Sequence, residues 1–150
     1  MTNEEIKEYF TTVAPSSTFD ETGEWLNVLI EAGSWKPLAQ RLRNSVFHFD
    51  YLFCLTCIDW KTHFTVVYHL SSTTYRHTIV IKANLDLANP VIETVSDIWR
   101  TAEFHEREVY ELFGVEFLHH PDLRRLILTD DFEGYPLRKN FEDPVNMIKL

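Results

Sequence analysis

The chain has 150 residues, of which 45% are hydrophobic, and 14 basic against 23 acidic side chains give it a formal net charge of −9. A chain of this length fits one domain that buries about 70% of the surface exposed by its unfolded form. The acidic balance excludes the basic surface that nucleic-acid binding requires, and it disfavours anionic lipid surfaces.

The N-terminus reads Met-Thr-Asn-Glu-Glu-Ile-Lys-Glu, without the basic start and apolar run of a secretory signal. No stretch approaches the roughly 18 apolar residues of a membrane-spanning helix. We therefore expect a cytosolic protein whose contact with any membrane is indirect, through a partner.

The first predicted element is a helix capped by Asn3. Residues 15–23, rich in Ser and Thr, are expected to form a linker, and the apolar run at 25–30 predicts a strand. The apolar side chains of the helix recur at the i, i+3, i+4, i+7 spacing of one face, and they are Ile6, Tyr9, Phe10 and Val13.

A second helix is predicted over residues 34–43. Ser34 can cap it, and Pro37 falls in the first turn, where the missing N–H of proline does no harm. Leu38 and Leu42 share one face of this helix and are expected to point toward the core.

Three strands are predicted over residues 51–60, 63–71 and 75–83, and the turn at 72–74 makes the last two a hairpin. Alternation places two sets of side chains on single faces of this hairpin. These sets are Phe64, Val66, Tyr68 and Leu70 in the first strand, and Tyr75, His77, Ile79 and Ile81 in the second.

Residues 91–99 fit a strand or a helix equally well, whereas 102–113 predict a helix that ends at Gly114, the usual C′ residue. This order of elements predicts an α+β two-layer fold, with helices packed on a mainly antiparallel or mixed sheet. We expect a core domain over residues 1–118 and an extended, irregular tail over 119–150, together forming one structural domain.

Cys54 and Cys57 form a Cys-x-x-Cys pair, a spacing typical of metal and redox sites. In a strand, residues three apart point to opposite faces, so the two sulfurs diverge. The sequence has no further cysteine to complete a metal centre with four ligands. We expect two buried, inert thiols.

The histidines also argue against a metal site. His105 is followed by a glutamate, as in a zinc helix, but the fifth position is Val109 rather than a second histidine. His119 and His120 are adjacent, so their side chains diverge. We expect His120 to hydrogen-bond nearby backbone and to shape the turn at Pro121.

The polar residues of the helix at 102–113 are expected to be solvated or to lie at an interface. Glu103, Arg107 and Glu111 follow at i, i+4 and i+8 and predict an exposed ladder of ion pairs. Glu106 and Glu108 could serve as paired acid–base carboxylates, but no nucleophile or phosphate loop accompanies them. An independent enzyme using this region remains a hypothesis that a turnover assay would test.

The tail carries the best candidates for specific recognition, Arg124, Arg125 and Arg138, because a guanidinium grips carboxylates in a bidentate manner. Nearby acids also allow internal salt bridges. A tail of this length without a structural period cannot bury itself well, and it is too apolar to be disordered. We expect it to gain order by lying along another protein.

The C-terminal third resembles the C subunit (NuoC-like family) of the proton-pumping NADH:quinone oxidoreductase, respiratory complex I. Three blocks in order carry the resemblance: Glu-Arg-Glu-Val-Tyr-Glu-Leu-Phe-Gly-Val at 106–115, His-Pro-Asp-Leu-Arg-Arg at 120–125, and Gly-Tyr-Pro-Leu-Arg-Lys at 134–139. The chain departs from the family at three turn positions, where Gly, Pro and Asp are usual. These positions hold His119, Thr129 and Asn140.

The resemblance implies a non-catalytic scaffold subunit of the hydrophilic arm, peripheral to the plasma membrane on its cytoplasmic side. Such a protein binds no cofactor or metal itself; NADH, FMN, iron–sulfur clusters and quinone belong to the whole complex, which couples electron transfer to proton translocation. Its expected partners are the quinone-pocket subunit and the subunit that holds the terminal iron–sulfur cluster. Membrane-bound hydrogenases and ferredoxin-dependent oxidoreductases contain similar subunits and remain an alternative.

The same resemblance, together with the arginine-rich tail, predicts a partner interface without catalytic residues. The expected interface residues are Arg107, Glu108, Tyr110, His120, Pro121, Leu123, Arg124, Arg125, Pro136, Leu137, Arg138 and Lys139.

Overall fold

The computed structural model describes residues 1–143, so the part of the expected tail at 144–150 lies outside the described residues. The helices are α1 (Asn3–Val13), α2 (Trp35–Asn44) and α3 (Ala102–Phe113), with a 3-10 turn, η1, at Ala32–Ser34. The strands are β1 (Thr18–Asp20), β2 (Leu26–Ile30), β3 (Tyr51–Asp59), β4 (His63–Ser72), β5 (His77–Asp86), β6 (Val91–Glu93) and β7 (Glu116–Leu118).

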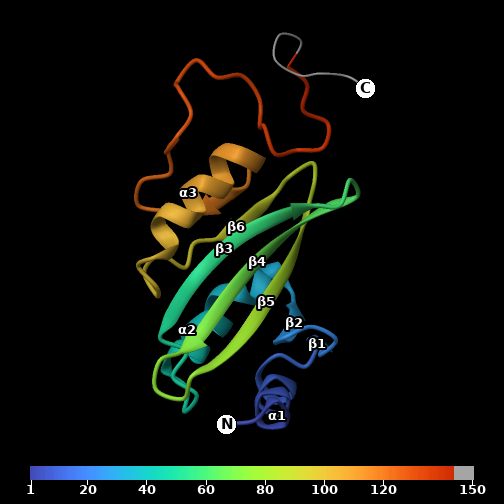
Figure 1. Cartoon of the computed structure of the whole chain (residues 1–150), viewed down its shortest axis with the longest axis vertical. Helices are drawn as coiled ribbons and strands as arrows, with labels where there is room; N and C mark the ends of the chain where they lie inside the picture. Colours follow the sequence, from blue (N-terminus) through green and yellow to red (C-terminus); the bar gives the residue numbers. More distant parts are fainter. Residues whose placement is uncertain (144–150) are drawn as a thin grey trace.

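The main sheet has five strands in the order β1-β2-β5-β4-β3, and β6 and β7 form a separate parallel pair. Strands β3, β4 and β5 form an antiparallel meander, whereas β2 runs parallel to β5. The α+β class and the mixed sheet predicted from the sequence are therefore confirmed. Figure 1 shows α1 at one end of the molecule and the residues after α3 at the other.

The predicted alternation of β4 is confirmed, because Phe64, Val66, Tyr68 and Leu70 are all fully buried. Helices α2 and α3 cover this face of the sheet. The ring of Trp35 on α2 lies 4.9 Å from that of Tyr68, and Phe113 on α3 lies 6.1 Å from Phe64, both measured between centroids. One hydrophobic core therefore joins the helical layer to the sheet.

Three local predictions in the N-terminal third are wrong. Thr2, not Asn3, caps α1: its Oγ1 accepts the N–H of Glu5, whose carboxylate accepts the N–H of Thr2 in return. The predicted linker at 15–23 contains β1, which pairs with β2 and gives the sheet its short outer strand. Ser34 precedes α2 but makes no side-chain cap, since the 3-10 turn η1 already leads into that helix.

Residues 91–99, ambiguous in the sequence, form β6 and then an irregular loop. Trp99 ends this loop in the core, where its indole Nε1 donates to the carbonyl of Phe49 at 2.8 Å. The hairpin strand predicted over 75–83 begins at His77 instead, because Tyr75 lies in the turn and exposes half of its surface.

The two cysteines lie on β3 as free thiols. Cys57 is buried, and burial raises the pKa of its thiol to about 12. Cys54 is half-buried, with burial again raising its pKa. The predicted burial is therefore confirmed for Cys57 and only in part for Cys54, which follows a register shift in the pairing with β4.

Candidate functional site

The C-terminal tail returns to its own last helix at Gly114. This glycine ends α3 with a φ of 80°, a left-handed conformation that side chains rarely adopt. A Cβ placed there would also come within 2.8 Å of the Tyr135 ring and 2.7 Å of the Arg138 guanidinium. Glycine at this position therefore serves both the helix end and the close approach of the tail.

Glu111 fastens the tail through backbone alone. Its carboxylate, on a residue that is only 2% exposed, accepts three consecutive N–H groups, from Leu126, Ile127 and Leu128. Burial works against the charge, but the three N–H donors outweigh it and lower the pKa of Glu111. The carboxylate is thus held ionised where it binds the chain.

Arg107, one turn earlier on α3, binds the preceding carbonyls. Its Nε donates to the carbonyl of Arg124 and its Nη2 to that of Arg125, both at 3.0 Å. Arg107 and Glu111 therefore hold acceptors and donors of one backbone stretch, and we call this pair the tail clamp. The prediction of an exposed ladder of ion pairs is wrong for Arg107 and Glu111, because the tail covers both side chains.

Two of the three tail arginines also point inward. Arg125 donates to the carbonyls of Thr129 and Phe132 at 2.5 and 2.6 Å. Arg138 donates from Nε to the carbonyl of Phe113 at 2.6 Å, and its guanidinium lies 4.5 Å from the Tyr135 ring centroid. These contacts satisfy backbone groups that an irregular segment would otherwise leave unpaired.

The described tail is partly buried or exposed along its length, but many of its backbone groups are hydrogen-bonded within the chain. Its side chains remain open to contact. Ile127 is 69% exposed, Leu137 52% and Leu126 40%, and Arg124 is exposed while pairing with Asp122 at 2.9 Å. The predicted internal salt bridge is thus present at Arg124.

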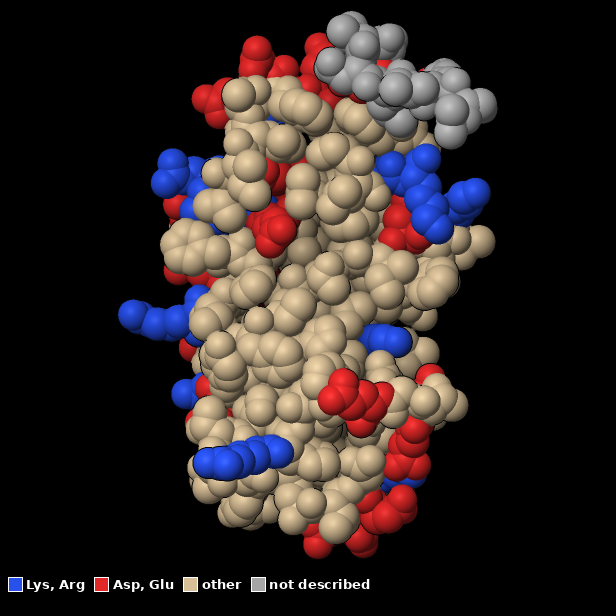
Figure 2. Space-filling model, viewed as in Figure 1, with Lys and Arg blue, Asp and Glu red and all other residues tan. Residues whose placement is uncertain are grey.

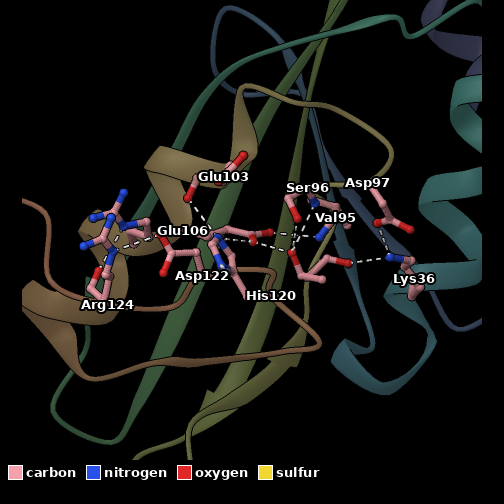
Figure 3. Close-up of polar contacts among 11 residues, drawn as sticks. Lys36, Val95, Ser96, Asp97, Glu103, Glu106, His120, Asp122 and Arg124 are labelled. Atoms are coloured by element: carbon pink, nitrogen blue, oxygen red, sulfur yellow. Dashed lines mark hydrogen bonds and ion pairs between the residues drawn. The ribbon is translucent and has the colours of Figure 1, made fainter.

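A buried polar cluster lies on the other side of α3 (Figure 3). Glu106 is fully buried; its Oε1 accepts the N–H of Val95 at 2.8 Å, and its Oε2 accepts the hydroxyl of Thr94 at 2.5 Å. Oε2 also lies 3.7 Å from Nε2 of His120, whose side chain is fully buried. The prediction of a solvated or interfacial Glu106 is therefore wrong.

His120 fulfils the role predicted for it. Its Nδ1 accepts the N–H of Asp122 at 3.0 Å, and its Nε2 lies 2.9 Å from the carbonyl of Glu103. One ring nitrogen thus closes the turn at Pro121, and the other ties this turn to α3.

The twelve residues expected at the interface fall into groups of different exposure. Pro121, Arg124, Leu137 and Lys139 are exposed. Arg107 and the side chain of His120 are buried. The remaining six are partly buried: Glu108, Tyr110, Leu123, Arg125, Pro136 and Arg138.

The structure adds Glu111, Leu126, Ile127 and Leu128 as residues of the clamped region that sequence reasoning did not assign to it. The available signal was the i, i+4 spacing of Arg107 and Glu111 beside a tail whose backbone needs partners.

The surface in Figure 2 carries Lys and Arg in small separate groups rather than in one continuous basic patch. No cluster of three or more potential metal-binding side chains occurs within residues 1–143. Across the same range, no helix has the length and apolar character needed to cross a membrane.

Fold and tail together define a two-layer α+β domain whose C-terminal segment is fastened to its last helix. A family model described as "Respiratory-chain NADH dehydrogenase, 30 Kd subunit" matches residues 28–145. The chain belongs to this family of complex I subunits, and the resemblance seen in the sequence is confirmed.

Several relatives are named as C subunits of NADH-quinone oxidoreductase. The one from Chlorobium phaeobacteroides is 32% identical over 141 residues, covering 91% of this chain and 84% of that protein. The one from Chloroherpeton thalassium is 38% identical over 112 residues, covering 73% of this chain and 47% of that protein. The combined C/D subunit of Phocaeicola vulgatus is 46% identical over 105 residues, covering 69% of this chain but only 20% of that longer protein.

Two solved structures share the fold. A fragment titled "Nqo5 of the trypsin-resistant fragment (1-134)" is 27% identical with a TM-score of 0.73, covering 82% of this chain and all of that chain. A chain of the membrane-bound sulfane sulfur reductase, an archaeal respiratory membrane complex, is 29% identical with a TM-score of 0.79. The match covers 93% of this chain and 85% of that chain.

Proposed function

We propose that the chain is a scaffold subunit of the hydrophilic arm of an NADH:quinone oxidoreductase. It binds no cofactor, performs no reaction by itself and holds its neighbours in the geometry that electron transfer from NADH to quinone requires. This transfer is coupled to proton translocation, and the protein lies on the cytoplasmic side of the plasma membrane. The observation that carries the proposal is the tail clamp, because it shapes a docking surface without using the exposed side chains.

The docking surface is the outer side of the tail. Its backbone is held by Arg107 and Glu111, so Leu126 and Ile127 are presented in one arrangement before any partner arrives. Preorganisation of this kind removes part of the ordering cost of association. Apolar side chains beside the exposed Arg124 make a surface typical of interface centres.

The proposed partners are the quinone-pocket subunit and the subunit with the terminal iron–sulfur cluster. The combined C/D relatives support the first of these, since their designation puts C and D segments in one polypeptide. A covalent link of that kind keeps two segments at high effective concentration. The buried members of the expected interface, Arg107 and His120, would act on the partner only through the tail.

A second candidate keeps the scaffold role but changes the complex. The neighbour in the sulfane sulfur reductase covers nearly the whole chain. The same fold can therefore serve a membrane complex with another electron donor, such as a membrane-bound hydrogenase or a ferredoxin-dependent oxidoreductase.

Native purification with a tag on this chain, followed by mass spectrometry of the captured particle, tests both candidates. An NADH-binding subunit in the particle supports the first, and its replacement by hydrogenase or ferredoxin-linked subunits supports the second. Capture of the chain alone from its native membranes contradicts both.

Two arginine variants then test the docking surface. Arg124→Ala is expected to weaken assembly while leaving the melting temperature of the free chain unchanged, because its exposed pair with Asp122 is worth at most about 1 kcal/mol. Arg138→Ala removes an internal hydrogen bond and an aromatic contact, so it should lower that melting temperature. Assembly unaffected by Arg124→Ala, together with unaffected assembly of Ile127→Asp, would exclude this surface.

A further inference from the structure

Glu106 is a buried carboxylate without a cation matched to it. The positive charge of Lys36 acts to lower the pKa of Glu106, but this ammonium is already bound to Asp97 and to the carbonyl of Thr94, the latter at 2.8 Å. The negative charge of Asp97 acts to raise the pKa of Glu106, and the charge of Glu106 in turn acts to raise the pKa of the Tyr68 hydroxyl. Burial accordingly raises the pKa of Glu106 to about 7.

His120 does not supply the missing charge in the arrangement observed. Because Nδ1 accepts the N–H of Asp122, the ring proton sits on Nε2 and points to the carbonyl of Glu103. A second proton on the ring would take away the acceptor of the Asp122 N–H. In this arrangement, the Nε2 proton is directed to the carbonyl of Glu103 rather than to Glu106.

The hydroxyls beside Glu106 fit either charge state of the carboxyl group. Thr94 has one proton but two oxygen neighbours, Oε2 of Glu106 at 2.5 Å and Oγ of Ser96 at 2.9 Å. With Glu106 ionised, Ser96 donates to Thr94 and Thr94 donates to Glu106. With Glu106 neutral, both bonds reverse and no heavy atom has to move.

The neutral acid finds an acceptor for its proton at Oε2. The Thr94 hydroxyl beside Oε2 can accept a hydrogen bond, whereas the Val95 N–H beside Oε1 can only donate, so the proton is placed on Oε2 and points to Thr94. Ser96 and Thr94 both line a cavity of about 690 Å³, whose wall also includes Lys36, Asp97 and Glu103. The hydroxyl chain therefore connects the buried carboxyl group to a cavity on the surface.

We propose that Glu106 is a proton-binding site, reached from this cavity through Ser96 and Thr94, and that loss of its proton loosens the His120 turn at the start of the tail. Uptake is balanced. A hydronium ion in the cavity gives a proton to Ser96 and becomes water, Ser96 passes its own proton to Thr94, and Thr94 passes its own to Oε2.

Loosening follows from the position of His120. Its buried ring lies 3.7 Å from Oε2 of Glu106, so release of the turn at 119–122 would uncover the ionised carboxylate to water. Glu106 is less acidic in the closed turn than in an open, hydrated one. The closed turn is thus favoured at low pH, and this advantage is lost as pH rises through about 7. The open fraction is therefore expected to grow by up to about tenfold per pH unit between the ordinary value of 4.5 and about 7, and to level off above that pH.

Carbon-detected NMR on the full chain labelled in its Glu carboxyl groups gives the first test. We expect the Glu106 signal to titrate near pH 7, and to titrate higher still in Thr94→Val, which removes a donor to the ionised form. Thr94→Ser keeps the hydroxyl and should behave as the unchanged protein. Titration of Glu106 close to the ordinary value of 4.5 would overturn the proposal.

Hydrogen exchange of the Asp122 amide, expressed as a protection factor between pH 5 and 8, gives the second test. Protection should fall with rising pH in the unchanged protein and in the matched control Glu116→Gln, whose carboxyl group is exposed on β7. Glu106→Gln mimics the neutral acid, because its amide can accept from Val95 and donate to Thr94, so its protection should be high and flat. An equal pH dependence of the protection factor in Glu106→Gln and in the unchanged protein would refute the coupling. If Glu106→Gln fails to fold, a protection factor independent of pH in the unchanged protein would refute it. These tests do not depend on the identity of any partner.

Discussion

Glu111→Gln is the sharpest perturbation of the tail clamp. It keeps the size and shape of the side chain but replaces a carboxylate that accepts three backbone N–H groups with an amide that offers one acceptor oxygen. Hydrogen bonds to a charged group contribute about 1.5–3 kcal/mol each, and losing one partner can leave a buried donor unsatisfied.

The net loss is smaller than three such bonds. Leu126 and Ile127 are substantially exposed, so water can reach their N–H groups when the carboxylate is gone. Allowing for one retained bond and for hydration, we expect about 2–3 kcal/mol less stability of the clamped segment. At 1.4 kcal/mol per factor of ten, this is a rise of about 30- to 100-fold in the open fraction of the tail.

Trypsin provides the assay, because Arg124 and Arg125 are cleavage sites whose carbonyls are held by Arg107. When opening and closing are fast compared with cleavage, the rate follows the open population. We expect cleavage after these two arginines to accelerate by the same 30- to 100-fold factor in Glu111→Gln. Glu108→Gln, which removes a half-buried carboxylate from the same helix, is the matched control and should change little.

Unchanged cleavage at both arginines in Glu111→Gln would refute the clamp as the feature that orders the tail. Faster cleavage across the whole chain would instead indicate global unfolding, which a melting curve separates from local opening. Low pH should reproduce the variant in the unchanged protein. The pKa of Glu111 is lowered in the folded chain, so its contribution is present above its unfolded value and is lost as pH falls through the folded one.

Three further outcomes follow from other parts of the structure. Gly114→Ala forces an alanine into a φ of 80° and against Tyr135, so thermal denaturation should show a loss of about 1–3 kcal/mol, and a wild-type melting temperature would contradict the close approach. Thr2→Ala removes the capping box of α1 and should cost about 1 kcal/mol in urea unfolding, whereas Asn3→Ala should cost less. Glu106→Gln should raise the free energy of unfolding at pH 8 more than at pH 5, and an equal effect at both values would show that the buried charge has no cost.

The sequence was sufficient for elements in which spacing alone decides the structure. The alternation around Tyr68 fixed the inner face of β4, and Gly114 marked the end of α3, because both signals are local. The sequence was insufficient for β1, whose three residues become a strand only through pairing with β2. Glu106 was misplaced for a related reason: charged residues are rarely fully buried, and the donors that permit its burial lie about ten residues away in the chain.

The tail shows why a motif can identify a family without revealing what its residues do. Read along the chain, Arg107 and Glu111 suggest a solvated helix, and the arginines at 124 and 125 suggest recognition of another protein. In the structure, the side chains of Arg107 and Glu111 bind the backbone of residues 124–128, about 17 residues away in the sequence. The tail therefore covers a helix face that was expected to be solvated. Helical periodicity reports which residues share a face, but not what covers that face.

The first of the three sequence blocks that carried the resemblance contacts both of the others. Block 106–115 meets block 120–125 where Glu106 lies beside His120 and where Arg107 binds two tail carbonyls. It meets block 134–139 at Gly114, against Tyr135 and Arg138. Much of the motif therefore fastens the tail within the chain. Under the proposed function, the exposed residues between the blocks, foremost Ile127, are expected to select the partner. Exchanging residues 126–129 between two relatives should accordingly transfer partner preference with the fold intact, and a chimera that folds but keeps its original partner would place recognition in the blocks themselves.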